Sequence, residues 1–235
     1  MCLIAIAHRV SKRYPLVIAA NRDEAFDRPT LKAHQWEDYP DVFGGRDGVH
    51  GGSWLAVTRS GRFAAVTNLR GATPRERSRG VLVHDFVTSQ SSAAEYADRI
   101  AGEADSFAGF HLLLGAPGEG IVQVSDGKPK QLSPGIHGLS NAPSGVHWEK
   151  VDLAVEAMSG ALSATEPEAI SGELLSFLSR RRGSVDPERE VFIEGDRYGT
   201  RSSTVVVAGA EGTLFVEQSY ERGGLVLPKR VLTRF

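Results

Sequence analysis

The sequence predicts an α+β protein in which each of two β-sheets is covered by a pair of helices. The expected elements follow one another as strands, two helices, strands, two helices and strands. The first two strands are almost continuous apolar runs, which is typical of strands buried on both faces. This order is compatible with a four-layer αββα sandwich, although composition alone does not choose that fold over another α+β arrangement.

The first two strands are expected at residues 3–7 and 16–20, joined by the polar segment 9–14. Such a short connection favours a hairpin. The second strand ends in a polar group formed by Asn21, Arg22, Asp23 and Glu24. A hairpin would place this group beside the start of the first strand, next to Cys2.

Cys2 is the only cysteine among the 235 residues. If the initiator Met1 is removed, Cys2 becomes the first residue and has both a thiol and a free α-amine. An unperturbed α-amine has a pKa of about 8, so it can take the thiol proton at neutral pH. A cysteine here also suits the apolar start of a buried strand, but the polar group beside it favours catalysis.

Residues 22–53 show no regular hydrophobic period and are interrupted by prolines and glycines. A loop of this length inside a compact domain is usually functional or disordered. The aromatic residues Trp36, Tyr39 and Phe43 favour order. We therefore expect an ordered loop that walls a cleft.

Residues 54–58 and 62–68 are expected to form a second hairpin. The segment after it, residues 70–79, is polar and basic, with arginines at positions 70, 75, 77 and 79 against Glu76. Two interpretations stay open for this segment. It is either a solvated loop or a clamp for a phosphate or carboxylate.

Two helices are expected at residues 80–88 and 93–103. Ser92, with Glu95 three residues later, fits a capping box at the start of the second helix. Strands are then expected at residues 109–115, 121–125, 130–132 and 135–141. The last of them should return to the edge of a sheet.

The region 148–182 is expected to form two more helices, because its apolar residues recur at spacings of three and four. Pro167 fits the first turn of the second of these helices. Four final strands are expected at residues 190–194, 202–208, 213–218 and 226–233.

The composition is that of a soluble globular protein, with 41% hydrophobic and 24% charged residues, and suits a single domain over residues 1–235. A net charge of −2 gives no basic excess for a nucleic-acid backbone. One cysteine excludes an intramolecular disulfide and a cysteine-based zinc site, and the histidines show no metal-binding spacing. Neither a membrane-spanning run nor a signal peptide is expected, so we expect a cytoplasmic location. The oligomeric state stays open.

Six short motifs follow one another from the N-terminus to the final strands. They are Cys2, Asn21-Arg22-Asp23-Glu24, Gly44-Gly45-Arg46-Asp47, Gly51-Gly52-Ser53-Trp54-Leu55-Ala56, Val66-Thr67-Asn68 and Thr200-Arg201-Ser202-Ser203. This series resembles the NRDE-motif family, which includes the transport and Golgi organisation protein 2 of eukaryotes. The resemblance implies a fold similar to the N-terminal-nucleophile (Ntn) hydrolases, an αββα sandwich.

The resemblance also implies roles for individual residues. In Ntn amidases similar to bile-salt hydrolase and penicillin V acylase, the N-terminal cysteine attacks an amide carbonyl. By resemblance, Cys2 is the nucleophile, Asp23 holds its amine, and Arg201 supports the nucleophile. Asn68 and Asn141 are the candidate oxyanion donors, since neutral amide donors stabilise a developing O⁻. Asn141 equally suits an Asx turn.

The chain departs from these amidases at one position. They place an arginine three residues before the aspartate, where this chain has Ala20. Arg22 follows Asn21 directly and is expected on the opposite strand face from it. The residues expected to bind substrate or support the site are Asn21, Arg22, Glu24, Arg46 and Trp54.

The function implied by the resemblance is hydrolysis of a linear amide or thioester. The alternative is a non-catalytic carrier or chaperone that holds haem or an acyl ligand in the same cleft, because eukaryotic members are connected to haem trafficking and acyl-CoA balance. No cofactor and no metal are expected. Haem would be a ligand, and the chain has no Cys-x-x-Cys-His attachment motif.

Overall fold

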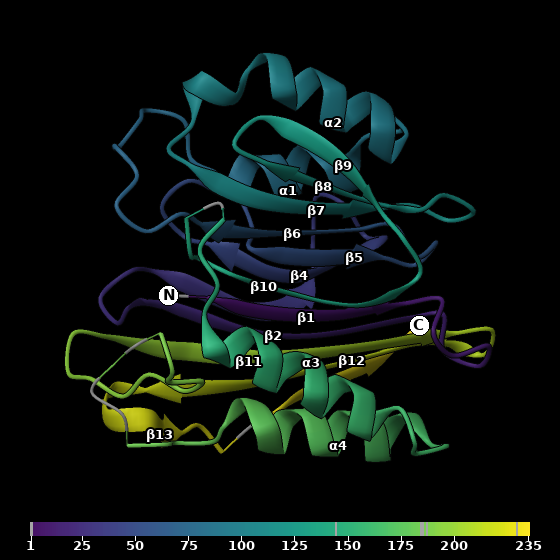
Figure 1. Cartoon of the computed structure of the whole chain (residues 1–235), viewed down its shortest axis with the longest axis vertical. Coiled ribbons are helices and arrows are strands. Elements are labelled where there is room, and N and C mark those ends of the chain that lie inside the picture. Colours follow the sequence, from purple (N-terminus) through teal and green to yellow (C-terminus); the bar gives the residue numbers. More distant parts are fainter. Residues whose placement is uncertain (1, 144, 184–185, 187, 229) are drawn as a thin grey trace. The chain divides into compact units, whose positions relative to one another are not determined.

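A computed structural model describes residues 2–143, 145–183, 186, 188–228 and 230–235 (Figure 1). The chain forms two compact units, and each unit is assembled from separate stretches of the sequence. The first unit comprises Met1–Asp27, Pro134–Ser140 and Val146–Phe235. The second unit comprises Arg28–Ser133 and Asn141–Gly145.

The first unit is built on an antiparallel sheet in the order β10-β1-β2-β11-β12-β13, with β14 also paired to β12. Its strands are β1 (Leu3–His8), β2 (Leu16–Ala25), β10 (Gly135–Ser140), β11 (Tyr198–Gly209), β12 (Gly212–Glu221), β13 (Leu225–Val226) and β14 (Val231–Arg234). The predicted hairpin of the first two strands and the predicted edge position of the strand near residue 135 are both confirmed.

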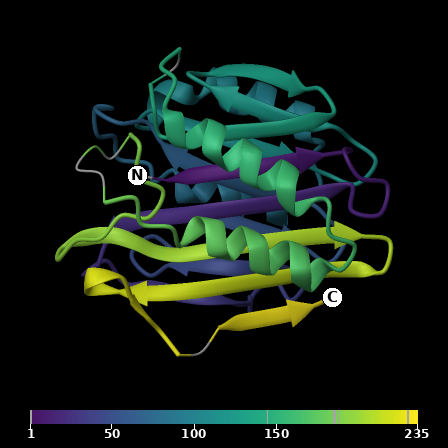
Figure 2. The same cartoon turned by 60° about the horizontal axis from the view of Figure 1, so that its bottom comes forward.

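Two helices, α3 (Glu149–Ala161) and α4 (Pro167–Leu178), lie across one face of this sheet (Figure 2). Alternate strand residues point to opposite faces, so the odd-numbered residues of β1 and β2 meet the helices. Leu3 and Val17 accordingly belong to one buried cluster with Met158 and Leu174.

The second unit is a sheet in simple sequence order from β3 to β9. Its strands are β3 (Thr30–Gln35), β4 (Val42–Asp47), β5 (Leu55–Thr58), β6 (Phe63–Asn68), β7 (Phe110–Gly115), β8 (Ile121–Ser125) and β9 (Lys128–Leu132). Helices α1 (Gly80–Thr88) and α2 (Ala93–Gly102) pack on it (Figure 1). The predicted capping box is present, because Ser92 and Glu95 each accept a hydrogen bond from the other's backbone N–H.

The prediction of a loop at residues 22–53 was wrong, since β2 runs to Ala25 and β3 and β4 lie within that range. Glycine usually weakens a strand, but here close packing requires it. A Cβ on Gly44 would lie 2.6 Å from the carbonyl oxygen of Leu55, and one on Gly45 would overlap the ring of Trp54. The glycines therefore mark close backbone approach within the sheet.

The prediction for the C-terminal strands was partly wrong. Residues 190–194 form no strand, although the Thr200 N–H donates to the Ile193 carbonyl and the Ile193 N–H donates to Thr200 Oγ1. The single strand expected at 226–233 is divided into β13 and β14. A short helical turn, η2 (Arg222–Gly224), precedes β13, with Gly223 at a positive φ of 65°.

We expect Gly52→Ala to destabilise the protein by about 2–3 kcal/mol, because a buried overlap forces backbone movement. The new Cβ would overlap the backbone of Gly80, whose carbonyl accepts the Ser53 N–H at 3.0 Å. Urea unfolding measures the effect. Gly172→Ala is the matched control, because Gly172 lies in α4 with open space around it. That control should stabilise by about 0.5–1 kcal/mol, and equal effects of the two variants would contradict the prediction.

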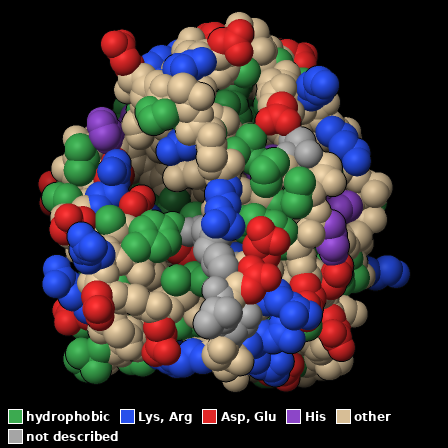
Figure 3. All heavy atoms as spheres, turned by 60° about the vertical axis from the view of Figure 1, so that its left-hand side comes forward, with side chains coloured by type: hydrophobic (Ala, Val, Ile, Leu, Met, Phe, Trp, Pro, Cys, Tyr) green, Lys and Arg blue, Asp and Glu red, His purple; other side chains and the backbone are tan. Residues whose placement is uncertain are grey.

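Positive and negative side chains are interspersed on the surface, and several of them form ion pairs. On the face shown in Figure 3, Lys and Arg side chains lie among Asp and Glu side chains. In the first unit, for example, Arg182 and Arg189 both pair with Glu149, at 3.0 and 2.6 Å.

Among the helices that the structure describes, none is long and apolar enough to cross a membrane.

Candidate functional site

Cys2 lies one residue before β1, beside the polar end of β2. The register pairs Leu3 with Asn21, so the next position of the ladder brings Cys2 level with Arg22. The backbone N–H of Asp23 forms a hydrogen bond with the Cys2 sulfur. The prediction that the end of the second strand lies beside the start of the first is therefore confirmed.

The environment of Cys2 favours the thiol over the thiolate. Burial raises the pKa of the Cys2 thiol, and the negative charge of Asp23 raises it further. The hydrogen bond from the Asp23 backbone and the positive charge of Arg22 lower this pKa, but the net shift is upward. A reaction through this sulfur therefore needs a nearby group that removes the proton.

Asn21 is a structural cross-link on the helix-facing side of β2. Its Nδ2 donates to the carbonyls of Leu178, at the end of α4, and of Val191, at 2.8 and 2.9 Å. Its Oδ1 accepts from Ser203 Oγ at 2.6 Å. Both polar atoms of the Asn21 side chain are hydrogen-bonded within the first unit. Asn21 therefore supports the candidate site by holding β2 to its neighbours, on the strand face that meets the helices.

Arg22 and Glu24 alternate with Asn21 along β2 and therefore point to the other face of the strand, which was predicted for Arg22. Their charged groups are 3.8 Å apart, with 7% and 26% of the side chains exposed. Arg22 thus lies on the same strand face as Ala20. Ser202 is paired with Arg22 in the ladder, and its buried Oγ has no hydrogen-bond partner among the described residues.

Arg201 lies at a register shift of β11, between Thr200 and Ser202. Its Nη1 donates to the carbonyl of Ala25 at 2.6 Å, and its guanidinium lies over the ring of Phe26, 5.5 Å from the centroid. These contacts direct Arg201 to the end of β2. Its role in supporting the nucleophile stays a prediction.

Two residues near Asp23 were missed by the sequence analysis. Thr200 Oγ1 donates to Asp23 Oδ1 at 2.7 Å, and Tyr198 Oη donates to the Asp23 carbonyl at 2.8 Å. Thr200 belonged to one of the family motifs, which was a signal. The register that places it opposite Asp23 is a property of the folded sheet.

Asn68 and Asn141 belong to the second unit, where the backbone brings them near each other. Asn68 is the exposed last residue of β6, and the N–H of Arg70 donates to the carbonyl of Asn141 at 2.9 Å. The buried Oδ1 of Asn141 has no partner in the part of the chain that the structure describes. Nearby, His111 bonds Ala142 O through Nε2 at 3.0 Å and so braces this segment.

Arg46 and Trp54 also lie in the second unit and fix its glycine-rich segments. Arg46 Nη1 donates to both carboxylate oxygens of Asp38, at 2.8 and 3.0 Å, and its guanidinium lies over Trp36. The ring of Trp54 fills the space beside Gly45. These contacts assign both residues a bracing role, and binding of substrate by either stays a prediction.

The arginines of the 70–79 segment are largely committed to one neighbouring stretch. Arg75 and Arg79 donate to the carbonyls of Asp105 and Gly109. Arg77 pairs with Glu103 at 2.8 Å. These contacts favour a structural role for the segment over an anion clamp.

Asp47 in the second unit is held by Arg28 through two hydrogen bonds of 2.9 and 2.8 Å. Burial by itself would raise the pKa of Asp47, but the hydrogen bonds and charge of Arg28 outweigh burial and hold that pKa below its usual value. A lowered folded-state pKa gives stability that is complete above the unfolded pKa of about 3.9 and is lost as the pH falls through the folded pKa.

We therefore expect Asp47→Asn to cost about 1–2 kcal/mol at neutral pH, because Arg28 loses a charged partner. The difference from wild type should shrink as the pH falls below about 4. Urea midpoints across this pH range measure it. Asp41→Asn is the control, since the Asp41 side chain is 84% exposed. A difference for Asp47→Asn that persists at the lowest pH would contradict the assignment.

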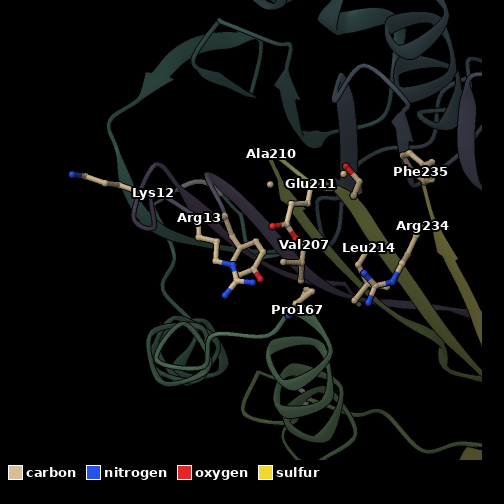
Figure 4. Close-up of a pocket in the computed structure, with 13 residues that line it drawn as sticks. Lys12, Arg13, Pro167, Val207, Ala210, Glu211, Leu214, Arg234 and Phe235 are labelled. Atoms are coloured by element: carbon tan, nitrogen blue, oxygen red, sulfur yellow. The ribbon is translucent and has the colours of Figure 1, made fainter.

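Two further features of the described residues concern metal binding and cavities. They contain no group of three or more His, Cys, Asp or Glu side chains placed to hold a metal ion. A cavity of about 350 Å³ opens in the first unit between Tyr14, Val207 and Leu214 (Figure 4). It lies at the far end of β1 from Cys2, about 17 Å along the strand at about 3.3 Å per residue.

Both arginines that line this cavity are paired with a glutamate. Arg13 pairs with Glu166 at 3.5 Å, and Arg234 pairs with Glu168. Lys12 points away from the other lining residues (Figure 4). Neither arginine therefore offers the cavity an unpaired positive charge. The distance along β1 separates the cavity from the candidate site.

Comparison with known proteins supplies the relatives of this chain. The family model described as Transport and Golgi organisation 2 matches residues 1–222. The Transport and Golgi organization protein 2 homolog of Bos taurus is 32% identical over an alignment 259 residues long. The alignment covers 93% of this chain and 93% of the relative.

Solved structures add the fold. Penicillin V acylase from Agrobacterium tumefaciens aligns with a TM-score of 0.58 at 14% identity, covering 100% of this chain and 86% of the acylase. A Caenorhabditis elegans ortholog of N-acylethanolamine-hydrolyzing acid amidase aligns at 0.54 and 12% identity, covering 88% of this chain and 92% of the ortholog. These neighbours confirm the predicted Ntn-hydrolase fold class.

Proposed function

The chain belongs to the Transport and Golgi organisation 2 family, and from this premise and its Ntn-hydrolase fold we propose that it hydrolyses a linear amide or thioester with Cys2 as nucleophile. One observation supports the proposal most directly, namely the β1–β2 register, which pairs Leu3 with Asn21 and so places Cys2 beside Arg22 and Asp23. The structural neighbours are described as an acylase and an amidase, which supports an acyl substrate.

The first half of the proposed reaction forms an acyl-enzyme. Once Met1 is removed, the α-amine of Cys2 takes the proton from the thiol, and Asp23 stabilises the ammonium that results. The thiolate attacks the carbonyl carbon and gives a tetrahedral oxyanion. As the C–N or C–S bond breaks, the ammonium returns its proton to the leaving amine or thiol, which leaves an acyl thioester on Cys2.

The second half consumes water. The free amine of Cys2 takes a proton from a water molecule, and the resulting hydroxide adds to the thioester carbonyl. This second oxyanion collapses to a carboxylic acid and expels the Cys2 thiolate, which takes the proton back from the Cys2 ammonium and becomes the thiol again. An oxyanion donor contributes on the order of 3 kcal/mol to such steps. The family resemblance assigns that part to Asn68 and Asn141, whose side-chain Nδ2 groups are the donors.

The experiment that tests the proposal is the intact mass of the purified protein, before and after brief alkylation at about pH 6 and about pH 8. Loss of the Met1 mass together with fast labelling at the lower pH supports an activated N-terminal thiol. A panel of acyl amides and thioesters then identifies the substrate. Retained Met1 with slow labelling that rises steeply with pH contradicts the proposal, because the thiol then lacks the Cys2 α-amine that would remove its proton.

One observation favours the second candidate function, a carrier of haem or an acyl ligand. The chain has Ala20 where the amidases have an arginine, so a part of their site is missing. A carrier predicts saturable ligand binding without turnover. A haem titration with no saturable Soret change, together with no ligand retained in native mass spectra, contradicts this alternative.

A further inference from the structure

Asp23 is held by β11 as well as by its own strand. The β2–β11 register pairs Asp23 with Thr200, which is fully buried. The Thr200 hydroxyl donates to Asp23 Oδ1 at 2.7 Å. A carboxylate that accepts this bond cannot rotate about its Cβ–Cγ bond without losing a buried hydrogen bond.

The direction of the Thr200 hydroxyl proton is itself fixed. The backbone N–H of Ile193 donates to Thr200 Oγ1 at 2.9 Å, and the N–H of Thr200 donates to the Ile193 carbonyl at 2.9 Å. A hydroxyl has one proton to donate. With Ile193 as the donor to Oγ1, that proton is directed to Asp23.

The backbone of Asp23 is fixed from the same strand. Tyr198 Oη donates to the Asp23 carbonyl at 2.8 Å. Burial of the phenol and the negative charge of Asp23 raise the pKa of Tyr198 further above its usual value, so Tyr198 keeps its proton at neutral pH. Tyr198 therefore holds the main chain of Asp23, while Thr200 holds its carboxylate.

The shape of β11 makes these contacts specific to Thr200. A register shift between Thr200 and Ser202 leaves Arg201 out of the regular pairing with β2. Such bulges re-aim side chains at functional sites. Here the shift lets Arg201 reach Ala25 while Thr200 stays opposite Asp23.

We propose that Thr200 is a positioning residue, which orients the Asp23 carboxylate so that one of its oxygens is presented to the Cys2 amine. This inference rests on the proposed function. An oriented carboxylate keeps the ammonium beside the sulfur and so favours the thiolate at neutral pH. A carboxylate that is free to rotate holds the ammonium less firmly and therefore favours the thiolate less.

Labelling of Cys2 tests the role without a known substrate, because this is the only cysteine in the chain. The iodoacetamide reaction rate is measured from about pH 5.5 to about pH 9.5 for wild type and for Thr200→Val, which keeps the shape and removes the hydroxyl. We expect the ratio of the neutral rate to the high-pH rate to fall by at least about threefold in this variant. If the substitution only loosened the packing around Cys2, the iodoacetamide reaction rate would rise at every pH and this ratio would stay unchanged.

Two variants complete the test. Thr200→Ser retains the hydroxyl and should restore the wild-type profile. Thr204→Val removes a matched buried hydroxyl of β11, which donates to Glu217 at 3.1 Å, and should not change the profile. Superposed profiles for Thr200→Val and wild type, or an equal change in Thr200→Ser, overturn the role of Thr200.

The intact mass of each sample separates the two ways of failing. A mature chain with superposed profiles overturns the role of Thr200 and leaves the proposed function standing. A chain that still begins with Met1 overturns both, because there is then no Cys2 amine for Asp23 to hold.

Discussion

Replacing Cys2 with alanine should lower the turnover of any amide or thioester substrate by on the order of 10³-fold or more, because the covalent route is lost. The effect should appear in kcat, with KM little changed, since the sulfur contributes mainly to bond-making steps. Cys2→Ser should also be strongly impaired, because a hydroxyl is far harder to deprotonate than a thiol. Steady-state rates on the substrate found by the panel measure both variants.

The control for this prediction is the stability of the variants. The Cys2 residue is partly exposed although its thiol is desolvated, and alanine removes only the sulfur atom, so Cys2→Ala should unfold in urea within about 1 kcal/mol of wild type. Turnover that survives in a folded Cys2→Ala protein would contradict the proposed nucleophile. Loss of turnover with ligand binding unchanged separates catalysis from binding, since the alanine variant still has the surrounding site.

Replacing Asn21 with leucine should have the largest effect on stability, a loss of roughly 3–6 kcal/mol. Asn21 is 1% exposed and satisfies two carbonyls and one hydroxyl. Each buried group left without a partner costs about 1–3 kcal/mol. Total stabilities are about 5–15 kcal/mol, so the variant should lie near the limit of folding.

Urea unfolding of Asn21→Leu and Ser203→Ala together tests this assignment. Ser203→Ala removes the bond to Asn21 Oδ1 at 2.6 Å and the bond that Tyr220 Oη donates to Ser203 Oγ at 3.2 Å, and should cost about 2 kcal/mol. The midpoint should move with little change in the m-value, because the surface exposed on unfolding is similar. An Asn21→Leu cost no larger than that of Ser203→Ala would show that Asn21 is not the cross-link between β2 and α4.

The features that depend on residues close together in the chain were predictable from the amino-acid sequence. The helix at 80–88 and the capping box of Ser92 and Glu95 have their signals within a few positions, so both were predicted closely. The meeting of Cys2 with Asp23 was predictable for the same reason, since a short turn joins the two strands. The family motifs determined the Ntn-hydrolase fold class.

The features that join distant segments became visible in the folded protein alone. Gly44 and Gly45 read as loop residues, but they lie in a strand because Leu55 and Trp54 occupy the space of their side chains. Thr200 meets Asp23 across 177 positions of sequence through a register that a bulge sets. Local periodicity contains no information on such pairings, because packing and register arise when the strands assemble.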